Sequence, residues 1–175
     1  MIIRYLQKTD AEFMLEWMHD PSVVKYLKTD FLSKTITDCY SFIEASKDVS
    51  ENLHLAVADD NNEYMGTVSL KNINHGTAEF GITVRKCAMG KGYSQYGMES
   101  IIDFGVTQYG LSKIYWCVDP ANIRAVRFYD KQGFDRCNAP KEAKNYTEEE
   151  KNKYSWYCVE CKKLNDLGDN ECRNE

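Results

Sequence analysis

The pattern of apolar and polar positions changes its period several times along the chain, and each change marks a predicted element. Residues 1–6 are rich in strand-forming types, and apolar side chains then recur at helical spacing over 10–18. This predicts a strand followed by a helix, which Pro21 is expected to end. A second helix is predicted over 33–46, with apolar residues on one side.

Three strand-like segments follow, and short turn signals separate them. They are 53–58, which alternates apolar and polar side chains, 64–73 and 77–84. The turns are Asp60-Asn61-Asn62 and Asn74-His75-Gly76, whose residue types favour tight turns. Strands joined by such short connections predict an antiparallel meander.

The second half of the chain alternates helices and strands. A helix over 94–109, a strand over 114–118, a helix over 121–131, a strand from Phe134 and a strand over 154–162 are predicted, with a polar stretch at 138–153. The order of elements predicts a mixed α/β (α+β) fold with one parallel crossover. We expect one domain over 1–162 and a polar, flexible tail over 163–175.

Length and charge narrow the class of protein. The chain has 175 residues and a net charge of −5, without the basic excess that nucleic-acid binders usually carry. No apolar run approaches the ~20 residues that cross a bilayer, and the start of the chain lacks the apolar stretch of a signal peptide. We therefore expect a cytoplasmic protein with no nucleic-acid or membrane partner.

The cysteine pattern predicts neither a disulfide framework nor a metal site. The seven cysteines are odd in number and irregularly spaced, which indicates reduced thiols. Cys158 and Cys161 form a lone C-x-x-C without a second pair or matching histidines, so we predict no metal.

The segment from Arg85 to Ser94 joins a predicted strand to a helix and contains two glycines. Glycine lets the backbone approach a ligand, and the first N–H groups of a helix attract anions. Arg85, Lys86 and Lys91 add positive charge, so the segment predicts a pyrophosphate site. It fits neither a Walker A loop nor a dinucleotide fingerprint, and an ordinary glycine loop is the alternative.

This segment resembles the [QR]-x-x-G-x-[GA] signature of the GNAT N-acetyltransferases. The matching residues are Met89-Gly90-Lys91-Gly92-Tyr93-Ser94. The resemblance implies that their backbone amides bind the pyrophosphate of acetyl-CoA. Met89 departs from the usual Gln or Arg, and Ser94 replaces Gly or Ala.

A second segment, 119–134, resembles the N-x-x-[AS]-x-x-[FL]-Y-x-x-x-G-F motif of the same family, through Asn122, Ala125, Phe128 and Tyr129. The resemblance implies that Asn122 meets the pantetheine arm and that Ala125 and Phe128 line the cofactor site. It also implies that the Tyr129 hydroxyl lies near the CoA sulfur and protonates the departing thiolate. Core packing is the alternative role for Tyr129.

A third segment, 17–23, resembles the W-x-[ND]-D-P-x-V of the branch that contains ribosomal-protein and spermidine acetyltransferases; His19 within it is read as structural. Glu79 stands ten residues before Met89, where spermidine-type enzymes have Glu. It is the candidate base or substrate-binding carboxylate, and a solvated charge or an ion pair is the alternative. Strand alternation places Glu79, Gly81 and Thr83 on one face.

The resemblance implies a mostly antiparallel GNAT-like sheet with a β-α-β acetyl-CoA core flanked by helices. Backbone groups of Ile82, Thr83 and Val84 would bind the pantetheine arm where two strands splay apart. The implied reaction is direct attack by an amine in a ternary complex, with an acyl-cysteine route through Cys87 or Cys117 as the minor alternative.

The acceptor is less defined by the residues. An amino sugar is preferred over a polyamine or a protein N-terminus, and the acidic chain is compatible with an amine. An acetyl-CoA-binding module without activity is the alternative that Met89 motivates. A homodimer is expected as the commonest assembly.

Overall fold

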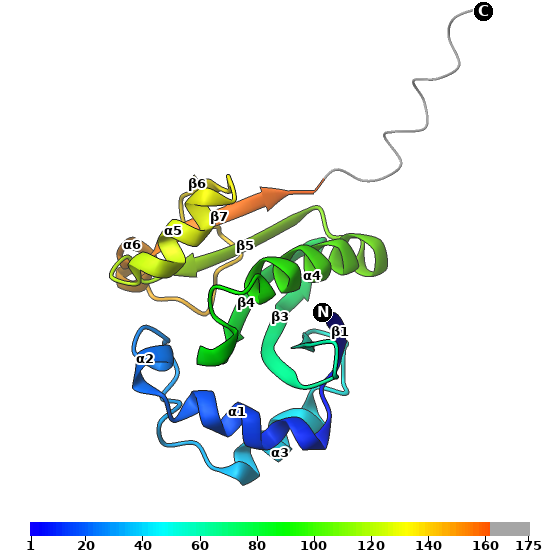
Figure 1. Ribbon diagram of the computed structural model, residues 1–175. Coiled ribbons are helices and arrows are strands. Elements are labelled where there is room, and N and C mark those ends of the chain that lie inside the picture. Colours follow the sequence, from blue (N-terminus) through cyan, green and yellow to red (C-terminus); the bar gives the residue numbers. More distant parts are fainter. Residues whose placement is uncertain (162–175) are drawn as a thin grey trace, which may run out of the picture.

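A single seven-stranded sheet runs through residues 1–161, the part of the chain that the computed structural model describes, in the order β1-β2-β3-β4-β5-β7-β6 (Figure 1). The strands are β1 (Ile2–Tyr5), β2 (Leu53–Ala58), β3 (Tyr64–Asn74), β4 (Thr77–Val84), β5 (Lys113–Val118), β6 (Asp135–Cys137) and β7 (Ser155–Glu160). Every neighbouring pair is antiparallel except β4 and β5, which are parallel. The predicted mixed fold, with its meander and one parallel crossover, is confirmed.

Helices lie on both faces of this sheet. They are α1 (Ala11–Met18), α2 (Pro21–Val24), α3 (Ile36–Ala45), α4 (Tyr93–Tyr109), α5 (Ile123–Lys131) and α6 (Glu148–Lys153), with 3-10 turns at Lys8–Asp10 and Lys86–Ala88. Side-chain caps fix several starts. Thr35 and Asp38 form a capping box on α3, and Thr147 and Glu150 form one on α6.

Pro21 does not end the first helix, as the sequence predicted, but begins the next one. Helix α1 already ends at Met18. The Asp20 carboxylate then accepts a hydrogen bond from the Ser22 N–H at 2.8 Å, and proline follows directly as the first residue of α2. Proline suits that position because its missing N–H would have no helical partner there.

Strand β2 shows why the two helical layers matter. The sequence predicted alternation over 53–58, yet all of these side chains except His54 are buried. Leu55 and Val57 belong to the core beneath α4, whereas Ala56 belongs to the core beneath α1 and α3. A strand covered on both faces loses its polar side.

Helix α4 packs close to the sheet because two glycines face it. A Cβ on Gly97 would lie 2.7 Å from Val57 Cγ2, and one on Gly105 would lie 2.8 Å from Leu70 Cδ1. The Gly97→Ala variant is therefore expected to lose about 1–3 kcal/mol of unfolding free energy through overpacking. Urea unfolding measures this. Asp103→Ala, on the exposed face of α4, is the control and should stay within about 0.5 kcal/mol; an equal loss in both variants would contradict the close-approach explanation.

Several expectations concern what the chain lacks. Within residues 1–161, no helix is long and apolar enough to span a membrane, and no group of three His, Cys, Asp or Glu side chains is arranged to hold a metal ion. The six described cysteines are free thiols. The predicted tail, 163–175, lies outside the described residues.

Candidate active site

Strands β4 and β5 pair only at one end. Their register joins Thr77–Glu79 to Lys113–Tyr115, and beyond it β4 is paired with β3 alone while β5 is paired with β7 alone. The facing edge of residues 80–84 therefore carries backbone N–H and C=O groups without a strand partner. An extended ligand can bind such an edge as an added strand does. Ile82, Thr83 and Val84 lie on this edge, where the sequence analysis placed them.

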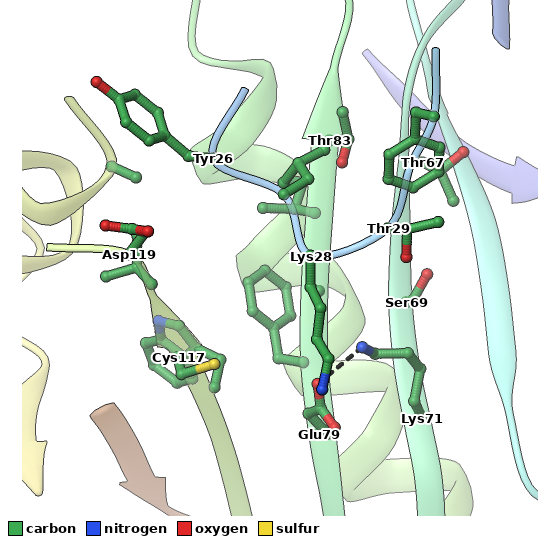
Figure 2. Close-up of a pocket in the computed structure, with 18 of the residues that line it drawn as sticks. Tyr26, Lys28, Thr29, Thr67, Ser69, Lys71, Glu79, Thr83, Cys117 and Asp119 are labelled. Atoms are coloured by element: carbon green, nitrogen blue, oxygen red, sulfur yellow. Dashed lines mark hydrogen bonds and ion pairs between the residues drawn. The ribbon is translucent and has the colours of Figure 1, made fainter. Parts of the chain in front are cut away.

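A cavity of about 590 Å³ lies in this gap. Figure 2 shows Thr83 and Glu79 on β4 across from Cys117 and Asp119 on the β5 side. Six predicted site residues line it: Glu79, Ile82 and Thr83 from β4, and Asn122, Ala125 and Tyr129 from the α5 segment. Val84, Phe128 and the loop 89–94 do not line it, and Phe128 packs against the core instead.

The loop 89–94 has the backbone of an anion site. Gly90 and Gly92 take φ values of +75° and +88°, which side chains disfavour, and α4 begins directly afterwards. The N–H groups of Gly92, Tyr93 and Ser94 have no hydrogen-bond partner within the described chain. These groups are free to bind a phosphate at the positive end of the helix dipole.

Met89, the departure from the family signature, has an apolar role. Its side chain packs against the cluster beneath α1 and α3, and its sulfur contacts the Arg124 guanidinium from α5. Arg124 thus brings next to the loop a charge that Met89 itself does not carry. Arg124 was not predicted from the sequence, because only the packing of α5 brings it to the loop.

Arg85 is not part of this anion site, contrary to the sequence prediction. Its side chain is buried, with Nη2 2.7 Å from Glu16 and Nη1 2.6 Å from Glu63. Its guanidinium also lies over the Phe13 ring. Two carboxylates already neutralise this charge, so Arg85 ties β4 to α1 and β3.

The Arg85→Met variant tests this structural role. Loss of its charged hydrogen bonds is expected to lower the unfolding free energy by about 1–2 kcal/mol. The loss is no larger because the half-exposed glutamates regain water in the variant. The Michaelis constant for acetyl-CoA, the substrate that the family resemblance implies, should not change. Lys91→Ala, an exposed loop residue with no ion pair in the described chain, should show the reverse: normal stability and a KM about 2–5-fold higher. A raised KM in Arg85→Met alone would contradict the assignment.

Glu79 is buried and bound in a network at the cavity wall. Its Oε1 lies 2.7 Å from Lys71 Nζ and accepts a 2.8 Å hydrogen bond from the Tyr146 hydroxyl (Figure 2 shows the Lys71 contact). Asn72 Nδ2 lies 3.4 Å from Oε2. With 5% of Glu79 exposed, the solvated-charge alternative is wrong, and the ion-pair alternative is observed together with a place in the cavity.

Tyr129 serves in the core and also reaches the cavity. It is 7% exposed, and its ring lies 5.3 Å from that of Trp116 and 5.2 Å from that of Tyr157, centroid to centroid. Burial raises the pKa of the Tyr129 phenol well above its ordinary value, so the hydroxyl stays protonated at neutral pH. This hydroxyl has no hydrogen-bond partner within the described chain, and it can donate its proton to a ligand atom in the cavity.

Asn122 has a structural task besides its predicted one. It is the N-cap of α5, and its Oδ1 accepts a hydrogen bond from the Ala125 N–H at 3.3 Å. The cap leaves its amide nitrogen for a ligand, because Asn122 also lines the cavity.

The cysteines do not favour the acyl-cysteine route. Cys117 lines the cavity, but burial raises the pKa of its thiol to about 11, so little of it is the reactive thiolate at neutral pH. Cys87 is exposed and lies outside the cavity lining. His19 also lies outside it, and its Nε2 is hydrogen-bonded to the Lys34 carbonyl at 2.8 Å.

An open sheet with diverging central strands, a glycine loop at a helix start, and a buried tyrosine and a carboxylate lining one cavity are typical of an acyl-CoA-dependent transferase. A profile of the GNAT acetyltransferase domain matches residues 1–135. The chain belongs to the GNAT family and is an acetyl-transferring enzyme.

Three similar proteins indicate the branch of the family to which the chain is related. It is 28% identical over 139 residues to a spermidine N(1)-acetyltransferase of Escherichia coli K12, covering 75% of this chain and 71% of that one. It is 24% identical over 143 residues to the uncharacterized N-acetyltransferase p20 of Bacillus licheniformis, covering 78% and 79%. The crystal structure of a Vibrio cholerae spermidine N-acetyltransferase with CoA and spermine has the same fold, with a TM-score of 0.75 at 20% identity, covering 93% and 96%. The predicted branch is confirmed; none of these proteins is named for an amino sugar, so that preference gains no support.

Proposed function

We propose that the protein transfers an acetyl group from acetyl-CoA to the primary amine of a small molecule, by direct attack in a ternary complex. One observation carries this proposal: the gap between β4 and β5 is a cavity with Glu79 on its β4 wall and Tyr129 on its α5 wall. An amine held at Glu79 and a thioester held near Tyr129 would face each other across it.

The observed backbone supports binding of acetyl-CoA. The unpartnered edge at Ile82–Val84 suits the amides of a pantetheine arm, and the free N–H groups at the start of α4 suit a pyrophosphate. Asn122 and Ala125 are proposed to border the arm from α5, whereas Phe128, predicted with them, packs against the core. The Arg124 guanidinium adds positive charge beside Met89.

In the proposed reaction, two side chains each take part in one proton transfer. The neutral amine nitrogen forms a bond to the acetyl carbon, and the carbon–sulfur bond breaks. The Tyr129 hydroxyl donates its proton to the leaving sulfur. The proton that the amine loses passes to the Glu79 carboxylate, directly or through water. Lys71 and Tyr146 hold this carboxylate in place.

A transfer assay tests the proposal. The protein is incubated with acetyl-CoA and single amines from four classes: polyamines, amino sugars with their phosphates, amino acids, and peptides with free N-termini. Mass spectrometry detects the acetylated product, because protein thiols interfere with dyes for released CoA. One acetylated class supports the proposal. Calorimetric binding of acetyl-CoA without any product would favour the binding-module alternative, and absence of both would contradict the site itself.

A polyamine is the second candidate acceptor, because the E. coli and V. cholerae relatives are named for spermidine. The amino sugar is a candidate from the sequence analysis only. The homodimer and the cytoplasmic location also stay predictions.

A further inference from the structure

A second cleft of about 290 Å³ adjoins the cavity at Glu79. Four residues line both spaces: Lys28, Lys71, Glu79 and Tyr146. The second cleft adds three asparagines, Asn52, Asn72 and Asn145. An acceptor with its amine at Glu79 would therefore extend its remaining groups into this polar cleft.

Two lysines and one carboxylate line the second cleft. Within the described chain Glu79 is its one carboxylate, and Lys71 Nζ already lies 2.7 Å from it. Lys28 Nζ lies 2.7 Å from Glu150 at the rim and over the Tyr146 ring. Figure 2 shows the Lys28 side chain extending from its loop into the space that Lys71 and Glu79 also line. Both lysine side chains keep substantial exposure, 51% and 38%, so a ligand can reach them.

Each carboxylate that lines the larger cavity already has a contact within the described chain. Its three acidic lining residues are Asp38, Glu79 and Asp119. Asp38 accepts hydrogen bonds from the Thr35 backbone and hydroxyl, and Asp119 lies 3.3 Å from Lys153. Lys34, also in the lining, has no ion pair within the described chain. A polyamine would bring further positive charge to these lysines, and like charges in a confined site repel.

Contacts that close the cleft are ones a ligand can replace. Lys28 Nζ donates to the Asn145 carbonyl at 3.3 Å, and Asn145 Nδ2 donates to Asn72 Oδ1 at 3.4 Å. These distances are at the long end of the range for hydrogen bonds, so exchanging them for shorter, charge-assisted bonds to an anion is favourable.

We propose that the second cleft is an anion subsite, and that the acceptor is a primary amine that also carries a carboxylate or phosphate group. Lys28 and Lys71 pair with the anion, and the amides of the asparagines donate to its oxygens. This inference rests on the proposed function and narrows its acceptor. It separates the protein from a polyamine-selective enzyme.

Matched acceptors test the subsite. Putrescine is compared with 4-aminobutyrate, and glucosamine with glucosamine 6-phosphate, so that each pair differs in charge at one end and the two pairs distinguish carboxylate from phosphate. The measured quantity is kcat/KM for each amine. The anionic member of at least one pair is expected to be preferred by about 10-fold or more, as one charge-assisted contact provides.

Variants connect this preference to Lys28. Lys28→Glu should reverse it, with about a 10-fold or larger change in the ratio of the two kcat/KM values, whereas Lys28→Arg should keep it. Lys47→Glu is the control, because Lys47 is exposed, pairs with Glu44 and lies outside both cleft linings. Thermal midpoints of all variants show whether each has folded.

The outcomes distinguish failure of the anion subsite from failure of the proposed function. Preference for putrescine and glucosamine, unaltered by Lys28→Glu, would overturn the anion subsite while the proposed function stands. If no amine is acetylated, the proposed function fails, and calorimetry with 4-aminobutyrate and glucosamine 6-phosphate still tests the subsite. Saturable binding that Lys28→Glu abolishes would support it, and absence of binding to the wild-type protein would overturn it.

Discussion

Replacing Tyr129 by Phe is expected to lower kcat for acetyl transfer by about 10²-fold, the effect of losing a positioned general acid. The Michaelis constant for acetyl-CoA should change little. The hydroxyl makes no hydrogen bond within the described chain, so its removal breaks no protein contact. The ring keeps its packing against Trp116 and Tyr157. Steady-state rates and a thermal melt of the variant measure both quantities.

Tyr157→Phe is the matched control for Tyr129→Phe. The Tyr157 hydroxyl donates to Asp130 Oδ1 at 2.9 Å and lies outside the cavity lining. Its loss is expected to lower the unfolding free energy by about 1–2 kcal/mol while kcat stays close to wild type. If Tyr129→Phe retained wild-type kcat, Tyr129 would not be the acid and its place in the cavity would be one of packing alone.

Replacing Glu79 by Gln is expected to lower kcat/KM for the amine by about 10²–10³-fold. An amide has nearly the same shape but does not accept the proton that the amine loses. It also leaves Lys71 without its anion, which puts an uncompensated ammonium beside the incoming amine. Kinetics across a range of pH separate the loss of the base from a change in amine binding. Acetyl-CoA affinity, measured by calorimetry, should be unchanged.

Two further variants serve as comparisons for Glu79→Gln. Glu79→Asp keeps the charge on a shorter side chain and should recover part of the activity. Glu160→Gln removes an exposed carboxylate on β7 that pairs with Lys113 at 3.3 Å, and it should have no effect on turnover. A raised amine KM with unchanged kcat in Glu79→Gln would make Glu79 a substrate-binding group and leave the base to a water chain.

The order of elements could be read from the sequence because local patterns encode it. The apolar period over 94–109 predicts α4 to within a residue, and the turn residues at 60–62 and 74–76 separate the strands of the meander. The 122–129 motif predicted Asn122, Ala125, Phe128 and Tyr129 in one site, and all of them except Phe128 line the cavity. These predictions depend on neighbours in sequence or on a recognisable motif.

Predictions that depended on distant partners were less successful. Arg85 looked available for phosphate, but Glu16 from α1 and Glu63, which directly precedes β3, neutralise it. The alternation expected over 53–58 is lost because helices cover both faces of β2. The glutamates that pair with Arg85 and the helices that cover β2 are distant in sequence, so the local apolar pattern does not reveal them.

By itself, the sequence determined the mixed fold, the family and the pairing of Glu79 with Tyr129 as candidate chemistry. Only the tertiary structure decided what surrounds Glu79. Lys28, Lys71 and Tyr146 come from three separate segments, and packing between the sheet, the loop after α2 and the segment before α6 brings them together. A net charge of −5 suggested a site compatible with cations, yet two of the three charged residues that line the cleft are lysines. Charge at a site depends on which few side chains the fold gathers there, and a sum over the chain does not contain that information.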